Sequence, residues 1–233
     1  SVSQILFPDR NKVWKIAAWI ITLYPMLVIY PLSLATENLF FLLFLGSFYT
    51  LLIAEKKRRW YWFALAGIML GLTALTRSVA LAFAGLAVLW IWLKLRELKN
   101  ALIVFLLICV VTLPWMVRNT LLNHKLTGIE SALGYDLYVG YHPQSSGTFQ
   151  YGISLDLMPY LDDGIRDEIG RSKAMDFIKA EPGRVPYLMV RRLGYFWGLE
   201  RRALTYFYSN NFFGYIPQIF LIPISIILSL PFA

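Results

Sequence analysis

The chain has 233 residues, of which 58% are hydrophobic and 15% are charged, and its mean hydropathy is +0.57. Soluble domains contain about a quarter charged residues, so this composition excludes an ordinary soluble domain and indicates a membrane protein. The net charge of +8 does not indicate nucleic-acid binding, because residues 118–211 hold 11 basic and 10 acidic residues without a basic stripe.

Six apolar runs are long enough to cross a bilayer as helices: residues 14–34, 36–54, 60–76, 78–93, 101–117 and 212–232. At 1.5 Å per residue they would span about 24 to 32 Å, close to the roughly 30 Å of bilayer hydrocarbon. The run FFLLFL at 40–45 is apolar at every position and lacks the alternation of a membrane β-barrel. We therefore predict an all-α integral membrane protein with about six transmembrane helices.

Basic residues of the short connections gather on one predicted side of the membrane. Ten of the eleven Lys and Arg residues outside the polar segment lie there, in the connections at 10–15, 56–59 and 94–99. The opposite connections hold only Glu37 and Arg77, and Arg118 follows where the polar segment begins. Since short cytoplasmic loops collect Lys and Arg, these three residues are predicted to lie on the extracytoplasmic side of a bacterial-type plasma membrane.

Residues 118–211 form a polar segment of roughly 90 residues, predicted to be extracytoplasmic. Its first part, through Gly147, is rich in Gly, Ser and Tyr and predicts an ordered loop. Residues 165–180 predict an amphipathic helix, with four apolar residues facing inward: Ile165, Ile169, Phe177 and Ile178. A second helix from about Pro186 mixes bulky apolar residues with arginines, which is typical of a helix on a membrane surface.

The pattern divides the chain into three parts: membrane helices in 1–117, the extracytoplasmic segment 118–211, and a truncated membrane helix in 212–233. The chain starts at Ser1 without Met or a signal-peptide pattern, and it ends within an apolar run. We therefore expect it to be a fragment of a longer protein.

Glu37 and Arg77 each allow a structural and a functional interpretation. Glu37 either stabilises a helix N-terminus, worth about 0.3–1 kcal/mol, or faces a polar cavity and binds a substrate hydroxyl, an amine or a metal. Arg77 either extends to lipid headgroups or offers its planar guanidinium to a phosphate. Arg118, which with Asn119 ends an apolar run, either anchors the helix at the interface together with Trp115 or joins Arg77 in a phosphate clamp at headgroup level.

Other candidates for a metal ligand or a base are interpreted as structural. The acidic cluster in 162–168 lacks the Gly-centred loop of an EF-hand and is interpreted as helix capping. His124 and His142 are isolated in the sequence, and Cys109 is the only cysteine, so no zinc-type ligand set or intrachain disulfide is predicted. No metal site is predicted, although the sequence leaves the use of a divalent cation open.

Four motifs follow one another along the chain: TENLF at 36–40, AGIMLGLTALTR at 66–77, LPWMVRN at 113–119 with its Pro-Trp-x-x-Arg-Asn pattern, and GYDLYVG at 134–140. In their order and spacing they resemble the GT-C glycosyltransferases, in the branch of protein O-mannosyltransferases and lipid A aminoarabinose transferases. The similarity covers about residues 10 to 210, and no single motif is decisive.

The resemblance implies transfer of a sugar from a polyprenyl-phosphate donor in the membrane to an extracytoplasmic acceptor, which is a lipid, a glycan or a protein. It implies that Arg77 and Arg118 hold the donor phosphate and that Glu37 lines the sugar or acceptor cavity, with Asn119 also at the substrate. The family's catalytic Asp or Asp/Glu pair has no match here. It is expected upstream, so the fragment alone is expected to be inactive.

The alternative is a non-enzymatic multi-pass transporter or scaffold for lipid-linked sugars. Transporters usually show internal repeats and interrupted helices at the bilayer midplane, whereas the charges of this chain lie at the predicted membrane edge. An acidic residue soon after one preceding apolar span would favour the enzyme.

Overall fold

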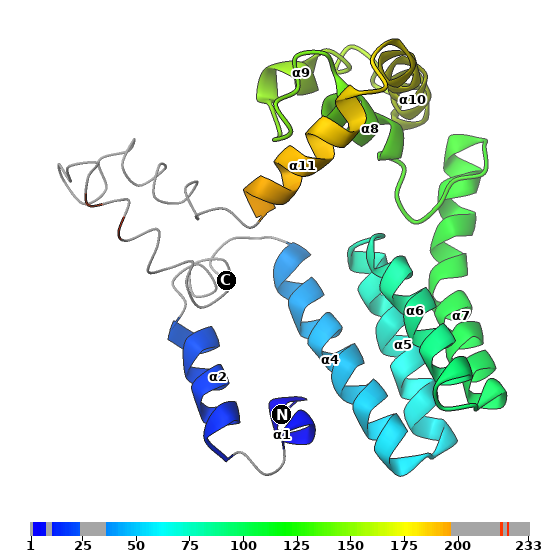
Figure 1. The fold of residues 1–233 in the computed structure, drawn as a ribbon. Coiled ribbons are helices and arrows are strands. Elements are labelled where there is room, and N and C mark those ends of the chain that lie inside the picture. Colours follow the sequence, from blue (N-terminus) through cyan, green and yellow to red (C-terminus); the bar gives the residue numbers. More distant parts are fainter. Residues whose placement is uncertain (1, 8–10, 24–35, 197–219, 221–222, 224–233) are drawn as a thin grey trace. The chain divides into compact units, whose positions relative to one another are not determined.

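The computed structural model describes residues 2–7, 11–23, 36–196, 220 and 223, and all ten elements within these ranges are helices (Figure 1). The chain divides into two compact units, Ser1–Glu130 and Ser131–Ala233. Unit 1 contains α1 (Val2–Leu6), α2 (Asn11–Leu23), α4 (Thr36–Lys57), α5 (Trp60–Thr76), α6 (Ala80–Leu93) and α7 (Leu98–Asn123). Unit 2 contains α8 (Leu133–Tyr141), α9 (Tyr151–Leu155), α10 (Asp163–Ala180) and α11 (Arg184–Phe196). The all-helical class is therefore confirmed for the described residues.

Two helices, α4 with 22 residues and α7 with 26, are long and apolar enough to cross a membrane. The apolar helices α5 and α6 have 17 and 14 residues, or about 26 and 21 Å at 1.5 Å per residue. These four helices lie where four of the six spans are predicted. The span at 14–34 is described only through Leu23, and 212–232 lies outside the described residues except for Phe220 and Pro223. Six spans therefore stay a prediction.

One face of α7 is apolar and uncovered within the described residues. Its exposed apolar side chains fall at the spacing of one helix face: Leu102, Phe105, Leu106, Val110, Leu113, Val117 and Leu121. In a soluble bundle the apolar stripe of a helix faces the core, and large exposed apolar patches mark contact with another surface or a membrane. The uncovered face of α7 is therefore suited to contact with lipid.

The core of unit 1 forms where α5 packs against α4 and α7. Two glycines of α5 allow the approach of α7: a Cβ on Gly67 would lie 2.8 Å from the carbonyl oxygen of Val104, and a Cβ on Gly71 would lie 2.8 Å from Cβ of Val111. Small residues spaced four apart let helix backbones approach closely in membranes. The sequence AGIMLGLTALTR thus has a packing role in α5, whatever else it does.

Buried hydroxyl groups in these helices bond to the backbone of their own helix. Ser47 donates to the carbonyl of Phe44 over 2.7 Å, and Thr73 donates to that of Met69 over 2.7 Å. Thr112 of α7 donates to the carbonyl of Ile108 over 2.9 Å. A polar group buried without a partner is costly, and these bonds satisfy the hydroxyls without help from water or another helix.

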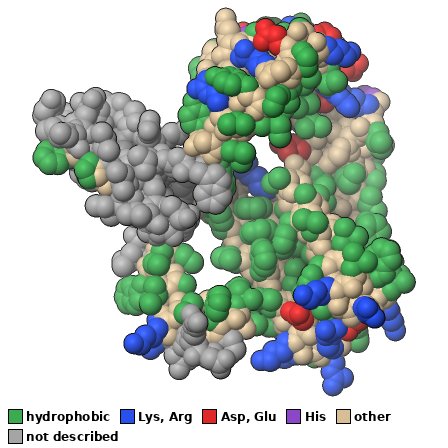
Figure 2. Space-filling model, viewed as in Figure 1, with side chains coloured by type: hydrophobic (Ala, Val, Ile, Leu, Met, Phe, Trp, Pro, Cys, Tyr) green, Lys and Arg blue, Asp and Glu red, His purple; other side chains and the backbone are tan. Residues whose placement is uncertain are grey.

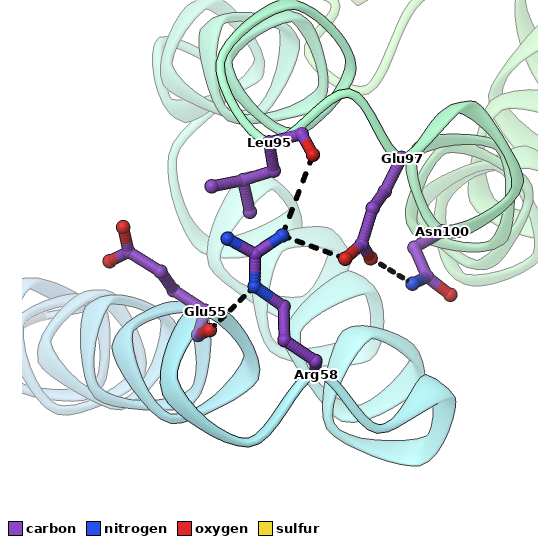
Figure 3. A network of polar contacts seen from close by, with 5 residues as sticks. All are labelled: Glu55, Arg58, Leu95, Glu97 and Asn100. Carbon is purple, nitrogen blue, oxygen red and sulfur yellow. Dashed lines mark hydrogen bonds and ion pairs between the residues drawn. The ribbon is translucent and has the colours of Figure 1, made fainter.

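Arg58 joins the two turns at the basic end of unit 1 (Figure 3). It has a left-handed φ of 51°, and its Nη1 lies 2.7 Å from the Glu97 carboxylate and 3.5 Å from the carbonyl oxygen of Leu95. Its Nε donates to the carbonyl of Glu55 over 2.9 Å, and Asn100 donates to Glu97. The α4–α5 turn is therefore fastened to the α6–α7 turn by one side chain.

The free energy of unfolding is expected to fall with the protonation of Glu97. The Arg58 guanidinium, and after it the Asn100 amide, hold the pKa of Glu97 below its ordinary value of 4.5. A depressed folded-state pKa contributes stability above the unfolded value, which is lost as the pH drops below 4.5 and through the folded pKa. Because the pair is partly exposed, the loss should be at most about 1 kcal/mol.

The measurement is the Tm of the detergent-solubilised protein as a function of pH, compared with that of the Glu97→Gln variant. We expect the variant to be less stable at neutral pH and the difference to shrink in acid. A difference that is constant across pH would show that the ion pair contributes nothing.

The prediction of a loop through Gly147 was wrong for two stretches of chain. α7 continues to Asn123, and α8 occupies part of the predicted loop. Gly134 of α8 serves packing instead of a turn, because a Cβ there would overlap the carbonyl oxygen of Asp167. Gly170 of α10 lies at the same contact between α8 and α10, because a Cβ there would lie 2.7 Å from the carbonyl oxygen of Gly134.

The two predicted helices of unit 2 are present as α10 and α11. The inward face of α10 was predicted only in part. Ile169 and Phe177 pack on the small core around Tyr138, but Ile165 is exposed and Gly170 and Ala174 are buried. Small residues face α8 because the backbones of the two helices come too close for a larger side chain.

Candidate functional site

Glu37 and Arg77 form an ion pair within unit 1, in which Nη2 of the guanidinium contacts Oε1 of the carboxylate. Glu37 lies in the first turn of α4, where a negative charge is favourable. Arg77 is the first residue after α5, and its extended backbone (φ −147°) ends that helix while its N–H still donates to Thr73. The pair uses one nitrogen of Arg77, so the guanidinium keeps further donors for another anion.

The residues next to Arg77 contact a segment that follows α7. Ser78 donates to Oε2 of Glu130 over 2.6 Å. The same segment accepts bonds from α7: the carbonyl of Ile129 lies 3.1 Å from Nε1 of Trp115 and 2.9 Å from Nδ2 of Asn119. Residues 128–130 therefore link the α5–α6 turn to the C-terminal part of α7.

Arg118 lies on α7 and is held by its two neighbours on that helix. Its guanidinium lies 4.6 Å from the ring centroid of Trp115, and Nη1 donates to Oδ1 of Asn119 over 3.1 Å. Asn119 is buried, and its Nδ2 is shared between the carbonyls of Gly128 and Ile129. Asn119 thus fixes both the 128–130 segment and Arg118, while the guanidinium of Arg118 stays exposed.

All four residues predicted for the site lie at one end of unit 1. Figure 1 shows that the N-terminus of α4 and the C-termini of α5 and α7 share this end, opposite the α4–α5 and α6–α7 turns. Glu37 pairs with Arg77, and Arg118 with Asn119. No local pattern pointed to Ser78 and Glu130, because their contact joins residues 52 positions apart.

Asp162 and Asp163 act at the start of α10, as predicted for the acidic cluster, whereas Asp167 contacts α8. Asp162 caps the helix by accepting from the N–H of Ile165 over 2.8 Å. Asp163 pairs with Arg166 over 3.0 Å. Asp167 accepts from the N–H of Gly134 over 2.5 Å, which holds α8 on α10. Among the residues placed by the structure, no three His, Cys, Asp or Glu side chains are arranged to hold a metal ion.

His142 packs on the small core around Tyr138 in unit 2. Its Nδ1 accepts from the backbone N–H of Gln144 over 3.2 Å, and its ring packs edge-on against Tyr138 and Phe177. The hydroxyl of Tyr138 donates to Asp156 over 3.0 Å. Burial of this tyrosine, followed by its bond to Asp156, raises the pKa of the phenol to about 12. His142 is thus held within unit 2 by its packed ring and its bond at Nδ1, with Nε2 3.9 Å from Oδ2 of Asp156.

A cavity of about 380 Å³ lies beside this core. It is lined by residues of α8, by the loop that follows α8, and by Arg192. Arg192 is already engaged, since its Nη2 donates to the carbonyl of Gly140 over 2.5 Å. The end of unit 1 that holds Glu37 and Arg77 therefore remains the better candidate site.

No family model, no curated protein and no solved structure matches the chain. The function is therefore inferred from the residues and their geometry.

Proposed function

We propose that the chain belongs to a membrane glycosyltransferase that moves a sugar from a polyprenyl-phosphate donor to an extracytoplasmic acceptor. The observation that carries the proposal is the gathering of Glu37, Arg77, Arg118 and Asn119 at the end of an apolar bundle opposite its basic turns. The order of motifs that resembles the GT-C glycosyltransferases supports the same function.

Arg118 is the stronger candidate for the donor phosphate. Within the described ranges it makes no ion pair, and its contacts are the Trp115 ring and the Asn119 amide. Stacking on an aromatic ring and a fixed amide orient a guanidinium without neutralising it. Arg77 forms an ion pair with Glu37. In this proposal Glu37 orients the remaining N–H donors of Arg77 toward the donor phosphate.

In the proposed reaction an acceptor hydroxyl or amine attacks the anomeric carbon of the sugar. The bond from that carbon to the phosphate oxygen breaks, and polyprenyl phosphate leaves with the electron pair. The guanidinium groups stabilise the charge that grows on the leaving oxygen. The acceptor proton passes to a general base, which the proposal does not assign among the described residues.

The test is transfer by the full-length protein in membranes, assayed with a panel of polyprenyl-phosphate sugars. We expect Arg118→Ala to lower turnover roughly 10²-fold, as loss of one charge-stabilising donor does in other enzymes. The control is Lys56→Ala, which removes an exposed cation at the opposite end of unit 1 and should leave turnover unchanged. Near-normal transfer by Arg118→Ala would contradict the proposal, and donor movement across the membrane without transfer would favour the transporter.

A further inference from the structure

The helix α11 exposes its apolar face. Met189, Val190, Leu193 and Phe196 are 55%, 68%, 59% and 76% exposed, while Leu188 on the opposite face is fully buried. At 100° per residue these four side chains cover a single face of the helix. A helix on the surface of a soluble unit would turn this face inward.

The cationic residues of α11 lie along its buried face and its edge. Arg184 donates to the carbonyl of Ser145 over 2.9 Å, and Arg192 donates to that of Gly140 over 2.5 Å. Arg191 lies between two tyrosines, with 3.0 Å from Nη1 to the hydroxyl of Tyr187 and 2.7 Å from Nη2 to that of Tyr195. The bonds from Arg184 and Arg192 fasten α11 to α8 and to the loop after it, in the orientation that leaves the apolar face outside.

The neighbouring helix α10 behaves as a solvated helix does. Its exposed residues include both signs of charge: Glu168, Arg171, Lys173, Asp176 and Lys179. Figure 2 shows Lys, Arg, Asp and Glu side chains gathered over α10, whereas hydrophobic side chains are prominent along α11. The outward apolar face therefore belongs to α11 and is not a general property of both helices.

We propose that α11 lies flat on an anionic lipid leaflet, with Met189, Leu193 and Phe196 in the boundary between headgroups and acyl chains. Its 13 residues carry no carboxylate, and Arg191 at the edge of the helix supplies a positive charge that complements anionic headgroups. Tyr and Arg beside an apolar stripe suit the headgroup level, where aromatic rings and cations collect. The inference is independent of the proposed sugar transfer.

A protein partner is less well matched to this surface than lipid. A stable protein interface buries at least about 1,000 Å² in total, and one face of a helix about 20 Å long offers four apolar anchors. An interfacial helix needs only such a stripe, because lipid accommodates the shape of each side chain.

The experiment is a depth measurement on the full chain in vesicles of phosphatidylcholine and phosphatidylglycerol. Cys109 is the only cysteine, so a Cys109→Ala background allows single probes from Met189→Cys, Leu193→Cys and Phe196→Cys. An environment-sensitive fluorophore at these positions should emit at shorter wavelength and be quenched severalfold more by lipid-attached spin labels than by an aqueous quencher.

The matched controls are Lys173→Cys and Arg171→Cys on α10, where the aqueous quencher should dominate. Replacing phosphatidylglycerol by phosphatidylcholine should weaken lipid quenching at Leu193 and Phe196 and leave the α10 positions unchanged. Aqueous quenching at Leu193 equal to that at Lys173 would overturn the proposal. Protection of Leu193 from both quenchers would also overturn it, since protein would then cover the face.

Discussion

The Gly67→Val substitution is expected to lower the stability of unit 1 by about 1–3 kcal/mol, the usual cost of overpacking a core. A Cβ at this position would lie 2.8 Å from the carbonyl oxygen of Val104 and 3.0 Å from Cβ of Leu107. The nearest atom belongs to the backbone of α7. The steric overlap can therefore be relieved only if α5 and α7 move apart where they pack. The expected result is a marked fall in the Tm of the detergent-solubilised protein.

Gly85→Val provides the matched control for this prediction. Gly85 is also a helical glycine, on α6, but a Cβ there would meet no atom within 4 Å. Both variants change helix propensity in the same way, so the difference in Tm between them isolates the contact with α7. An equal effect of the two substitutions would show that the close approach at Gly67 contributes nothing to stability.

The helices of unit 1 were predictable because apolar runs of about twenty residues have few alternatives to a helix in a bilayer. Their ends were less predictable. α7 continues beyond residue 117 to Asn123, since Pro114 lies within the helix without ending it. The amide of Asn119, five residues after Pro114, donates to the carbonyls of Gly128 and Ile129. This return of the chain depends on tertiary contacts that no local pattern carries.

Candidate site residues such as Glu37 and Arg77 could be placed at one end of the bundle by counting the predicted membrane crossings along the chain. Each crossing reverses the direction of the chain, so the side of every connection follows from the order of the apolar runs. The partners of those residues do not follow from it. The bond from Ser78 to Glu130 and the stacking of Arg118 on Trp115 require the actual path of the chain.

Unit 2 was harder to predict, because the sequence alone does not distinguish a glycine that allows a loop conformation from one that allows two helices to pack closely. Gly134 and Gly147 stand in similar surroundings rich in Tyr, Ser and Gly. Gly147 has a left-handed φ of 92°, which favours glycine in a loop. Gly134 is helical and makes room for the backbone of α10. Only the loop interpretation was drawn, so α8 was missed.

The proposed function leads to a specific expectation for the Glu37–Arg77 pair. Arg77→Ala should lower transfer by roughly 10²-fold, because it removes a guanidinium that stabilises the leaving phosphate. Glu37→Gln should have a smaller effect, since the amide can still accept a bond from Arg77 but orients it less firmly. If the carboxylate acts by positioning the guanidinium, the double variant should be no slower than Arg77→Ala alone.

The measurement is kcat and KM for the four proteins in the cycle, each with its Tm to separate lost function from lost folding. Arg77→Lys provides a further comparison, because it keeps the charge but loses the planar fork, and it should restore only part of the rate. Additive losses from Glu37→Gln and Arg77→Ala would show that the two residues act separately on the substrate. Near-normal rates with Arg77→Ala would remove Arg77 from the phosphate site, whereas the effect of Arg118→Ala would decide whether a phosphate is bound at this end at all.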